Sequence, residues 1–426
     1  MSTTMATLTI AQASCADDYD PNSMPVAKAR AFIHQFLDPV RGILRVPVRS
    51  ALGRVLAEDV LSPVDVPAHR NSAMDGWAVR GADLKGEGET TLAEIGASFA
   101  GRPFDGRVGP GQCVRIMTGG VVPEGADTVV MQERAKADGK SIAIAPGQKT
   151  GQNVREAGED LQAGSVALRK GRIVRPAELG LVASLGIGEV AVYRPLRVAF
   201  FSTGDELKSV GTALAAGEIY DSNRYTLFGM LTRLGCEVLD MGVVRDDPKL
   251  LERAFDEAAR SADVVITSGG VSVGEADFVK AMLDKLGEVV FWKIAMKPGR
   301  PLAYGKIGGA HFFGLPGNPV SVMVTFYQFV RDALLVLAGA NPVEPVPTFT
   351  ATCAARLKKA PGRTEFQRGI LARGPDGALT VKPTGEQGSG ILKSMSDANC
   401  FIILGDATGN VEAGTPVEVQ LLEGIV

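Results

Sequence analysis

The stretch VVITSGGVSVGEADF, residues 264–278, contains two patterns that could do chemistry. Gly270 and Gly274 flank Ser272 in the G-x-S-x-G spacing of a hydrolase nucleophile elbow, where the serine stands on the turn directly after a strand. Here residues 268–270 separate Ser272 from the apolar run that predicts the strand. Consecutive glycines also let backbone N–H groups wrap around a phosphate. We therefore favour a phosphate cradle over a nucleophile.

A serine nucleophile would also need a base nearby. The only downstream histidine is His311, in GGAHFFGL, which we expect at a hairpin or at the start of a strand. A five-residue pattern with one unplaced histidine is a weak match, so a Ser272 hydrolase is kept only as an alternative.

Acidic residues follow further apolar runs. Asp205 and Glu206 follow RVAFFS, Asp246 follows VLDMGVV, and Asp277 closes the stretch described above. The carboxyl ends of parallel strands meet at one edge of a sheet, and ligands bind there. Mg²⁺ prefers oxygen ligands and is often shared with substrate phosphates. Carboxylates at several strand ends could therefore hold Mg²⁺ together with its waters.

Basic residues and the predicted start of a helix follow the remaining apolar runs. VVFWKIAMKPGRP contains Lys293, Lys297 and Arg300 with no acid among them. FFGLPGNP is expected to open a helix directly after Gly317 and Asn318. Clustered cations and a helix N-terminus both stabilise a bound anion. The same sheet edge should therefore hold an anion beside the metal.

Composition limits the classes of function. The net charge of -3 over 426 residues gives no support for nucleic-acid or membrane binding. The five cysteines are far apart and form no C-x-x-C pair, which is typical of a reducing cytosol. Three scattered histidines do not suggest a zinc site. The 51 glycines indicate many tight turns.

The predicted helices and strands that position these residues differ in pattern from one region of the chain to the next. Apolar runs alternate with amphipathic helices over 196–340, which predicts a parallel α/β sheet covered on both faces. Short β-like runs between Gly and Pro turns precede and follow this region, and the later ones fit a barrel or a sandwich. We expect a tail over 1–22, a discontinuous linker domain over 23–61 and 151–195, an inserted β domain over 62–150, an α/β domain over 196–340 and a β domain over 341–426.

Targeting signals are not expected. The first basic residue is Lys28, so the chain lacks the charged start of a signal peptide. The apolar helix after Pro319 contains Arg331 and Asp332, which we expect to interrupt it before it could span a membrane. We predict a cytoplasmic protein.

Taken together, the motifs resemble the molybdopterin molybdenumtransferase family, the MoeA group related to the E domain of gephyrin. The resemblance runs from about residue 24 to the end and rests on NSAMDGWAVR, RIMTGG, GED, FSTGDEL, SGGVSVGEADF, KPGRP, GLPGNPVS, FQRG and QGSG in that order. It implies an elongated α+β N-terminal region with the inserted β domain, a molybdopterin-binding α/β domain and a C-terminal β barrel.

The resemblance also implies an activity. Adenylylated molybdopterin would be bound, molybdate inserted at its dithiolene, and AMP released with the help of Mg²⁺. The family acts as a homodimer in which N-terminal segments of one subunit complete the cleft of the other. Handover to the upstream adenylyltransferase and to apo-molybdoenzymes is a further expectation. Two alternatives are a molybdopterin adenylyltransferase and a non-catalytic, gephyrin-like scaffold.

Family roles transfer to matching positions of this chain. Substrate and metal would be bound by the four acids named above. The catalytic set would include Asp75, Thr118, Asp160, Glu206, Asp246, Asp277, Lys293, Lys297, Arg368 and Ser389. The pterin and its phosphate would be held by Thr203, Gly204, Asp205, Ser268, Gly269, Gly270, Ser272, Gly274, Pro298, Arg300, Gly317 and Asn318. For Asp75, Thr118 and Asp160 the resemblance is the only argument. Neighbouring Lys358 and Lys359 instead fit a solvated barrel surface.

Overall fold

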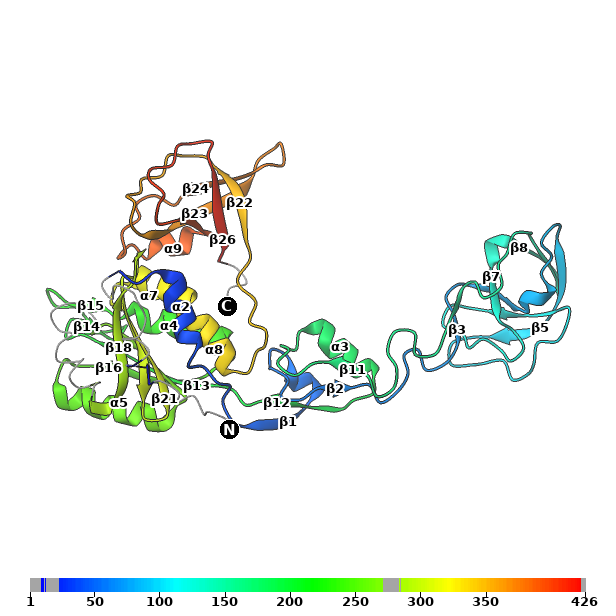
Figure 1. Cartoon of the computed structure of the whole chain (residues 1–426), viewed down its shortest axis with the longest axis horizontal. Coiled ribbons are helices and arrows are strands. Elements are labelled where there is room, and N and C mark those ends of the chain that lie inside the picture. The colour runs from blue at the N-terminus through cyan, green and yellow to red at the C-terminus, as the bar shows by residue number, and fades with distance from the viewer. Residues whose placement is uncertain (1–8, 11, 13–22, 271–282, 284, 423–426) are drawn as a thin grey trace, which may run out of the picture.

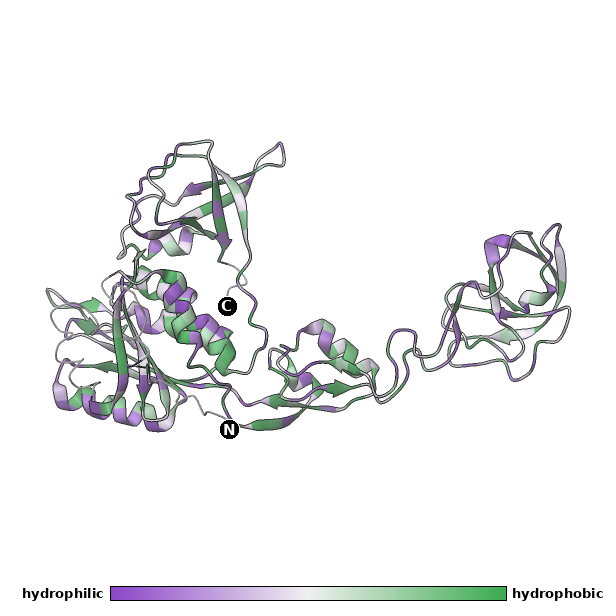
Figure 2. Ribbon diagram, in the orientation of Figure 1, coloured by the Kyte–Doolittle hydropathy of each residue, from purple (hydrophilic) through white to green (hydrophobic). Residues whose placement is uncertain are grey.

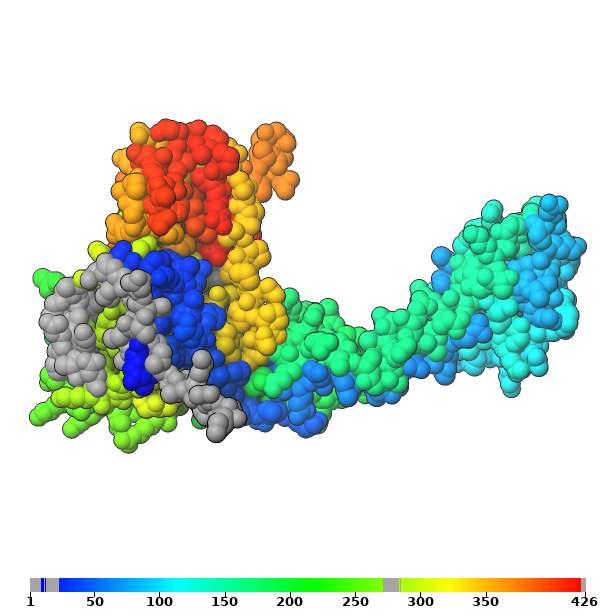
Figure 3. All heavy atoms as spheres, viewed as in Figure 1, coloured from blue at the N-terminus to red at the C-terminus, as the bar shows by residue number. Residues whose placement is uncertain are grey.

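The computed structural model describes residues 9, 10, 12, 23–270, 283 and 285–422. Figure 1 shows an α/β domain and a small barrel together at one end, and a separate β domain at the far end of an extended arm. The chain runs out along this arm and returns, so residues 43–61 and 166–193 lie side by side. Figure 3 shows the arm and the distal domain as a narrow extension from the larger lobe.

The α/β domain is built on a six-stranded sheet in the order β16-β13-β17-β21-β20-β18. The inner strands β13, β17, β20 and β21 are mostly buried, as expected for a sheet covered on both faces, whereas the edge strands β16 and β18 are partly exposed. β20 runs antiparallel to both neighbours, so β18 regains the direction of the parallel strands. The loop after β18 therefore opens at the same edge as those after the parallel strands. The bounds are β13 (Arg197–Thr203), β16 (Glu237–Val244), β17 (Val264–Ser268), β18 (Gly287–Lys293), β20 (Pro301–Ile307) and β21 (Ala310–Leu315).

Helices cover both faces of this sheet. One face packs against α2 (Val26–His34), α4 (Ser222–Arg233) and the run formed by α7 (Pro319–Thr325), the π-helical η4 (Phe326–Val330) and α8 (Arg331–Leu337). α5 (Pro248–Ser261) covers the other face, and Figure 2 shows hydrophilic residues spaced along it between hydrophobic ones. Although α2 lies within the predicted linker segment, its Phe32 packs edge-on against Trp292 with 5.0 Å between ring centroids.

The prediction that Arg331 and Asp332 interrupt the helix after Pro319 is wrong. The helical run continues to Leu337, and the two side chains form an ion pair of 2.5 Å. By length and composition alone the run Pro319–Leu337 could cross a membrane, but 67% of its apolar window is buried inside the fold. The run Pro319–Leu337 is therefore mostly a core helix of the α/β domain.

Two-stranded ladders build the arm. β1 (Ile43–Pro47) pairs with β12 (Glu189–Tyr193), β2 (Val60–Leu61) with β11 (Val166–Leu168), and β3 (Asn71–Ser72) with β10 (Val154–Arg155), all antiparallel. The 3-10 turn η1 (Val48–Ala51) and α3 (Pro176–Ser184) close a small apolar core on them. Gly186 follows α3 with φ of 72°, the left-handed conformation in which a glycine commonly ends a helix.

The distal domain is a six-stranded sheet in the order β7-β4-β6-β5-β9-β8 with an apolar cluster on each face. Its elements are β4 (Gly76–Val79), η2 (Gly81–Asp83), β5 (Thr90–Ser98), β6 (Gln112–Ile116), β7 (Thr128–Met131), η3 (Gln132–Arg134), β8 (Ala135–Asp138) and β9 (Ser141–Ile144).

The C-terminal domain is a closed five-stranded barrel, because β23 pairs with both β24 and β25. The bounds are β22 (Thr348–Cys353), β23 (Thr364–Arg373), β24 (Leu379–Pro383), α9 (Lys393–Asp397), β25 (Cys400–Leu404) and β26 (Pro416–Leu421). One short strand of the loop after β18, β19 (Met296–Lys297), pairs with β23 and joins the two domains. The predicted fold class is confirmed, with β20 as an antiparallel strand that the pattern did not predict. The domain boundaries stay predictions.

Candidate functional site

A cleft of about 1010 Å³ lies at the carboxyl edge of the central sheet. Its walls are the loops that follow β13, β17, β18 and β21, and residues of the barrel close it from the other side. Thirteen residues predicted from the sequence line it: Thr203, Gly204, Glu206, Asp246, Ser268, Gly269, Gly270, Lys297, Pro298, Arg300, Gly317, Asn318 and Ser389. The cleft therefore lies at the sheet edge where the strand ends were expected to gather.

Glycines bring the backbones of these loops close together. Gly204, Gly269 and Gly270 have φ of 143°, 91° and 70°, which side chains rarely tolerate. A Cβ added at Gly269 would lie 2.7 Å from the carbonyl oxygen of Thr203, and one at Gly317 would lie 3.8 Å from the Cα of Gly269. Such close backbone approach is what a phosphate cradle requires.

Asn223 joins two walls of the cleft. Its Nδ2 donates to Ser268 Oγ at 2.8 Å and to the Gly317 carbonyl at 2.6 Å. The sequence analysis missed this residue and its neighbour Asp221, which caps α4 by accepting from the Arg224 N–H at 3.2 Å. The signal was the segment Asp-Ser-Asn at residues 221–223, an N-cap at the start of a predicted helix.

Three buried polar atoms in this wall have no hydrogen-bond partner within the described part of the chain. They are Thr203 Oγ1, Asp221 Oδ2 and Asn223 Oδ1. All three residues line the cleft and are less than a tenth exposed. An unpaired buried polar atom costs about 1–3 kcal/mol, so atoms gathered in this way indicate a polar ligand.

The predicted metal ligands are only partly brought together. Glu206 and Asp246 line the cleft, whereas Asp205 points to solvent beside them and is not part of its wall. Asp277 lies outside the described residues, as do Ser272 and Gly274. Within the ranges the structure describes, no group of three or more His, Cys, Asp or Glu side chains is placed to hold a metal.

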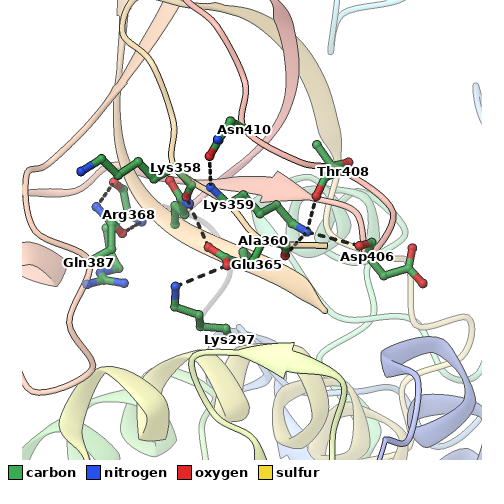
Figure 4. Close-up of polar contacts among 11 residues, drawn as sticks. Lys297, Lys358, Lys359, Ala360, Glu365, Arg368, Gln387, Asp406, Thr408 and Asn410 are labelled. Carbon is green, nitrogen blue, oxygen red and sulfur yellow. Dashed lines mark hydrogen bonds and ion pairs between the residues drawn. The ribbon is translucent and has the colours of Figure 1, made fainter. Parts of the chain in front are cut away.

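Cations line the side of the cleft next to the barrel. They are Lys297, Arg300 and Arg363, the last of which the sequence analysis did not single out. Lys293 ends β18 and is not among the lining residues. The ammonium of Lys297 lies 3.3 Å from Glu365 Oε1, a carboxylate of the barrel that is 4% exposed (Figure 4).

Arg368 lies behind the cleft wall rather than in it. Its guanidinium donates to Ser394 Oγ at 3.0 Å and to the Gly388 carbonyl at 2.9 Å, and the residue is 1% exposed. Burial lowers the pKa of Arg368 to about 10. Arg368 therefore supports the loop at 387–390, which includes Ser389 and does line the cleft.

The expectation that Lys359 is a surface residue is wrong. It is 6% exposed, and its ammonium donates to the carbonyls of Thr408, Ala360 and Asp406 at 2.8, 3.2 and 3.4 Å (Figure 4). Desolvation by burial lowers the pKa of Lys359. Three acceptors compensate the buried charge, so this lysine clamps barrel loops together.

The remaining predicted residues lie in or near the distal domain. Asp75 and Thr118 contact each other through two hydrogen bonds, and Asp160 is exposed near the neck formed by β3 and β10. Figure 1 shows the length of the arm between this region and the central sheet. Within one chain they cannot reach the cleft.

The structure gives no support to His311 as the base of a serine nucleophile, nor to Cys113, Cys236 or Cys400 as nucleophiles. His311 is the second residue of β21, so it lies toward the edge of the sheet opposite the cleft, 3.4 Å from the Tyr304 hydroxyl. Burial raises the pKa of the Cys113 and Cys236 thiols to about 12 and that of Cys400 to about 11. Thiols with such pKa values are poor nucleophiles near neutral pH.

Comparison with known proteins agrees with this architecture. Family models described as MoeA N-terminal region (domain I and II), probable molybdopterin binding domain and MoeA C-terminal region (domain IV) match residues 24–186, 199–336 and 350–422. A molybdopterin molybdenumtransferase of Haemophilus influenzae is 48% identical over 375 residues, which cover 88% of this chain and 92% of that protein.

Two further relatives cover nearly the whole chain. Gephyrin of Dictyostelium discoideum is 33% identical and covers 94% of this chain and 62% of its own length. A crystal structure described as the molybdopterin biosynthesis moeA protein from Pyrococcus horikoshii superimposes with a TM-score of 0.81 at 29% identity, covering 94% of this chain and all of that one. The chain therefore belongs to the molybdopterin molybdenumtransferase, or MoeA, family.

Proposed function

We propose that this protein is a transferase that inserts molybdenum into adenylylated molybdopterin and releases AMP. The observation that carries the proposal is the composition of the cleft. A glycine cradle with unpaired buried oxygens, three carboxylates including the helix-capping Asp221, and three cations all line one space. A substrate with a phosphoanhydride, together with a tetrahedral oxyanion, requires these groups in this combination.

The cradle would hold the phosphates of the substrate. The backbone at Gly270 and the first turn of α7 after Asn318 would supply donors without added charge, whereas the Gly269 N–H already donates to the Leu315 carbonyl at 3.1 Å and the Val320 N–H to the Ser389 carbonyl at 3.1 Å. Asn223 keeps the two loops at a fixed separation. These internal hydrogen bonds and those of Asn223 would hold the two loops in place around the substrate phosphates.

Glu206 and Asp246 fit a magnesium ion. Both carboxylates line the cleft, and Mg²⁺ is usually held by one or two carboxylates plus substrate phosphates rather than by a full protein cage. Asp205 and Asp277 remain proposed ligands from the family resemblance. The ion, when bound, would take up negative charge that develops on the cleaved phosphates.

The cations would gather the oxyanion. Molybdate is a dianion, and its approach to a phosphoanhydride is opposed by like charge. Lys297, Arg300 and Arg363 face the cleft from one side and offset that repulsion. Ser389 adds a hydroxyl on the loop that Arg368 supports.

A second copy of the chain would complete the site. Asp75, Thr118 and Asp160 cannot reach the cleft of their own chain along the arm, so we propose a homodimer in which they face the partner's cleft. A cytoplasmic location and handover of intermediates to other enzymes of the same synthesis are part of this proposal. The described cysteines, which are all free thiols, support the location.

The proposal is tested by AMP release from adenylyl-molybdopterin. We expect release that needs Mg²⁺, is stimulated by molybdate and is lost on chelation. Glu206→Gln keeps the side-chain shape without the charge and should slow release by about a hundredfold or more. The matched control is Glu237→Gln, because Glu237 begins β16 at the opposite edge of the sheet. If wild-type protein neither binds nor cleaves the nucleotide under any of these conditions, the scaffold alternative replaces the enzyme.

A further inference from the structure

The Lys297 ammonium, one of the cleft cations, has a buried counter-ion. Glu365 Oε1 lies 3.3 Å from Lys297 Nζ, and the carboxylate side chain is 4% exposed while the lysine side chain is 46% exposed. The contact crosses the seam between two domains, because β19 pairs with β23 in a register that places Lys297 opposite Glu365. The lysine can therefore turn toward the cleft, whereas the glutamate cannot leave its place.

Glu365 is held from its other side. Gln367 Nε2 donates to Glu365 Oε2 at 2.9 Å and to the Lys358 carbonyl at 3.0 Å. The nearby Lys359 ammonium is already occupied by three carbonyls. The charge of Glu365 acts on the Lys297 ammonium at 3.3 Å and also favours the charged form of the nearby Lys359. A buried carboxylate at this distance acts more strongly than an exposed one, since water screens it less.

We propose that Glu365 is a positioning residue for Lys297 and that its charge competes with the incoming oxyanion for the lysine ammonium. In the empty cleft Lys297 is held at the seam by Glu365. A tetrahedral dianion draws the ammonium into the cleft, and Glu365 draws it back when the oxyanion has left. This competition lowers the affinity of the cleft for the free oxyanion, which favours transfer of the oxyanion to the bound substrate. The inference rests on the proposed function, because it takes molybdate as the anion.

The test is oxyanion binding to the full-length protein, measured by calorimetry with molybdate alone. Glu365→Gln should tighten binding by about five- to tenfold and make it more sensitive to salt. In Glu365→Gln the new amide oxygen can still accept the hydrogen bond from Gln367. The amide NH₂ group then faces Lys297, whose ammonium can move away from it. Glu365→Asp keeps the charge and should stay within about twofold of wild type. Glu412→Gln, which breaks an exposed ion pair with Arg356 in the same barrel, should change nothing.

A double-mutant cycle separates competition from a general structural effect. In a Lys297→Met background, Glu365→Gln should no longer change molybdate affinity. In turnover, Glu365→Gln should lower the KM for molybdate with little change in kcat, whereas a merely loosened barrel would raise KM. Weaker binding by folded Glu365→Gln, an unchanged effect without Lys297, or no saturable binding by any variant would overturn the inference.

Failure of the two proposals can be told apart. If AMP release is absent but Glu365→Gln tightens molybdate binding through Lys297, the counter-ion role stands and the transferase reaction fails. If AMP release behaves as expected and Glu365→Gln leaves affinity unchanged, only the counter-ion role fails. Should Glu365→Gln not fold, the single variant Lys297→Met decides, because loss of the ammonium must weaken molybdate binding by about tenfold.

Discussion

Asp75 and Thr118 are joined by two hydrogen bonds at the tip of the arm. The backbone N–H and the hydroxyl of Thr118 both donate to Asp75 Oδ1 at 2.7 Å. The backbone bond, followed by the hydroxyl bond, holds the pKa of Asp75 below its ordinary value. Two donors on one oxygen fix the orientation of this carboxylate, which the proposed dimer would direct at the partner's cleft.

Mixing two inactive variants tests whether a second copy supplies the cleft. Asp75→Ala and Glu206→Ala should each be inactive. Because a mixed dimer would contain one intact cleft and one doubly damaged cleft, an equal mixture should regain about a quarter of wild-type AMP release. The control is Asp75→Ala mixed with Thr118→Val, which damages the distal side of every cleft and should stay inactive. No recovery in the first mixture, despite exchange between tagged copies, would contradict a shared site.

Removal of the Asn223 amide should loosen the cradle. Asn223→Ala leaves Ser268 Oγ and the Gly317 carbonyl without their donor, and we expect nucleotide affinity to fall by about tenfold or more. Equilibrium dialysis with AMP measures this effect without turnover. Tyr225→Ala on the same helix, whose side chain is 53% exposed, is the matched control. If Asn223→Ala and Tyr225→Ala bind AMP with equal affinity, the two hydrogen bonds donated by Asn223 do not contribute to binding.

A methyl group at Gly269 should close the cradle. In Gly269→Ala the new Cβ would meet the Thr203 carbonyl at 2.7 Å and Thr203 Oγ1 at 3.0 Å. The control is Gly211→Ala, because Gly211 has a similar φ of 87° against 91° and nothing within 4 Å of an added Cβ. Both variants carry backbone strain, but only Gly269→Ala should lose AMP binding. If both lose it equally, strain rather than the cradle explains the loss.

Stability should fall below pH 6.5 because of His311. Burial, and next the charge of Lys306, lower the pKa of His311 from 6.5 to about 4. As pH falls from 6.5 to 4 the unfolded chain takes up the proton and the folded chain does not, so the free energy of unfolding drops by at most roughly 3 kcal/mol. Below pH 4 the folded state is also protonated and this loss levels off.

Urea unfolding at pH 7 and pH 5 measures the effect. Trp292 lies on the same sheet as His311, with 6.4 Å between its ring centroid and that of Tyr304. Its fluorescence in a Trp77→Phe background therefore reports on unfolding of the α/β domain. His311→Gln should show a smaller stability difference between the two pH values than its parent. An identical difference would mean that His311 is protonated in the folded state.

The sequence determined the fold class and most of one side of the site. Apolar runs alternating with amphipathic helices require a sheet covered on both faces, and such a sheet brings its strand ends to one edge. For that reason Glu206, Ser268, Gly269, Lys297 and Asn318 were predicted at one place and were found there. These are local patterns, and the rule that joins them is general.

Only the tertiary structure decided which distant residues meet. Six basic residues lie between 356 and 373, and nothing in that segment predicts a partner for Glu365, yet strand pairing across a domain seam places it against Lys297. Arg368 was expected in the cleft and is buried behind its wall, and Lys359 was expected at the surface and is enclosed by carbonyls. Pairing register and burial depend on contacts between segments far apart in the chain, and no local pattern of residue types contains that information.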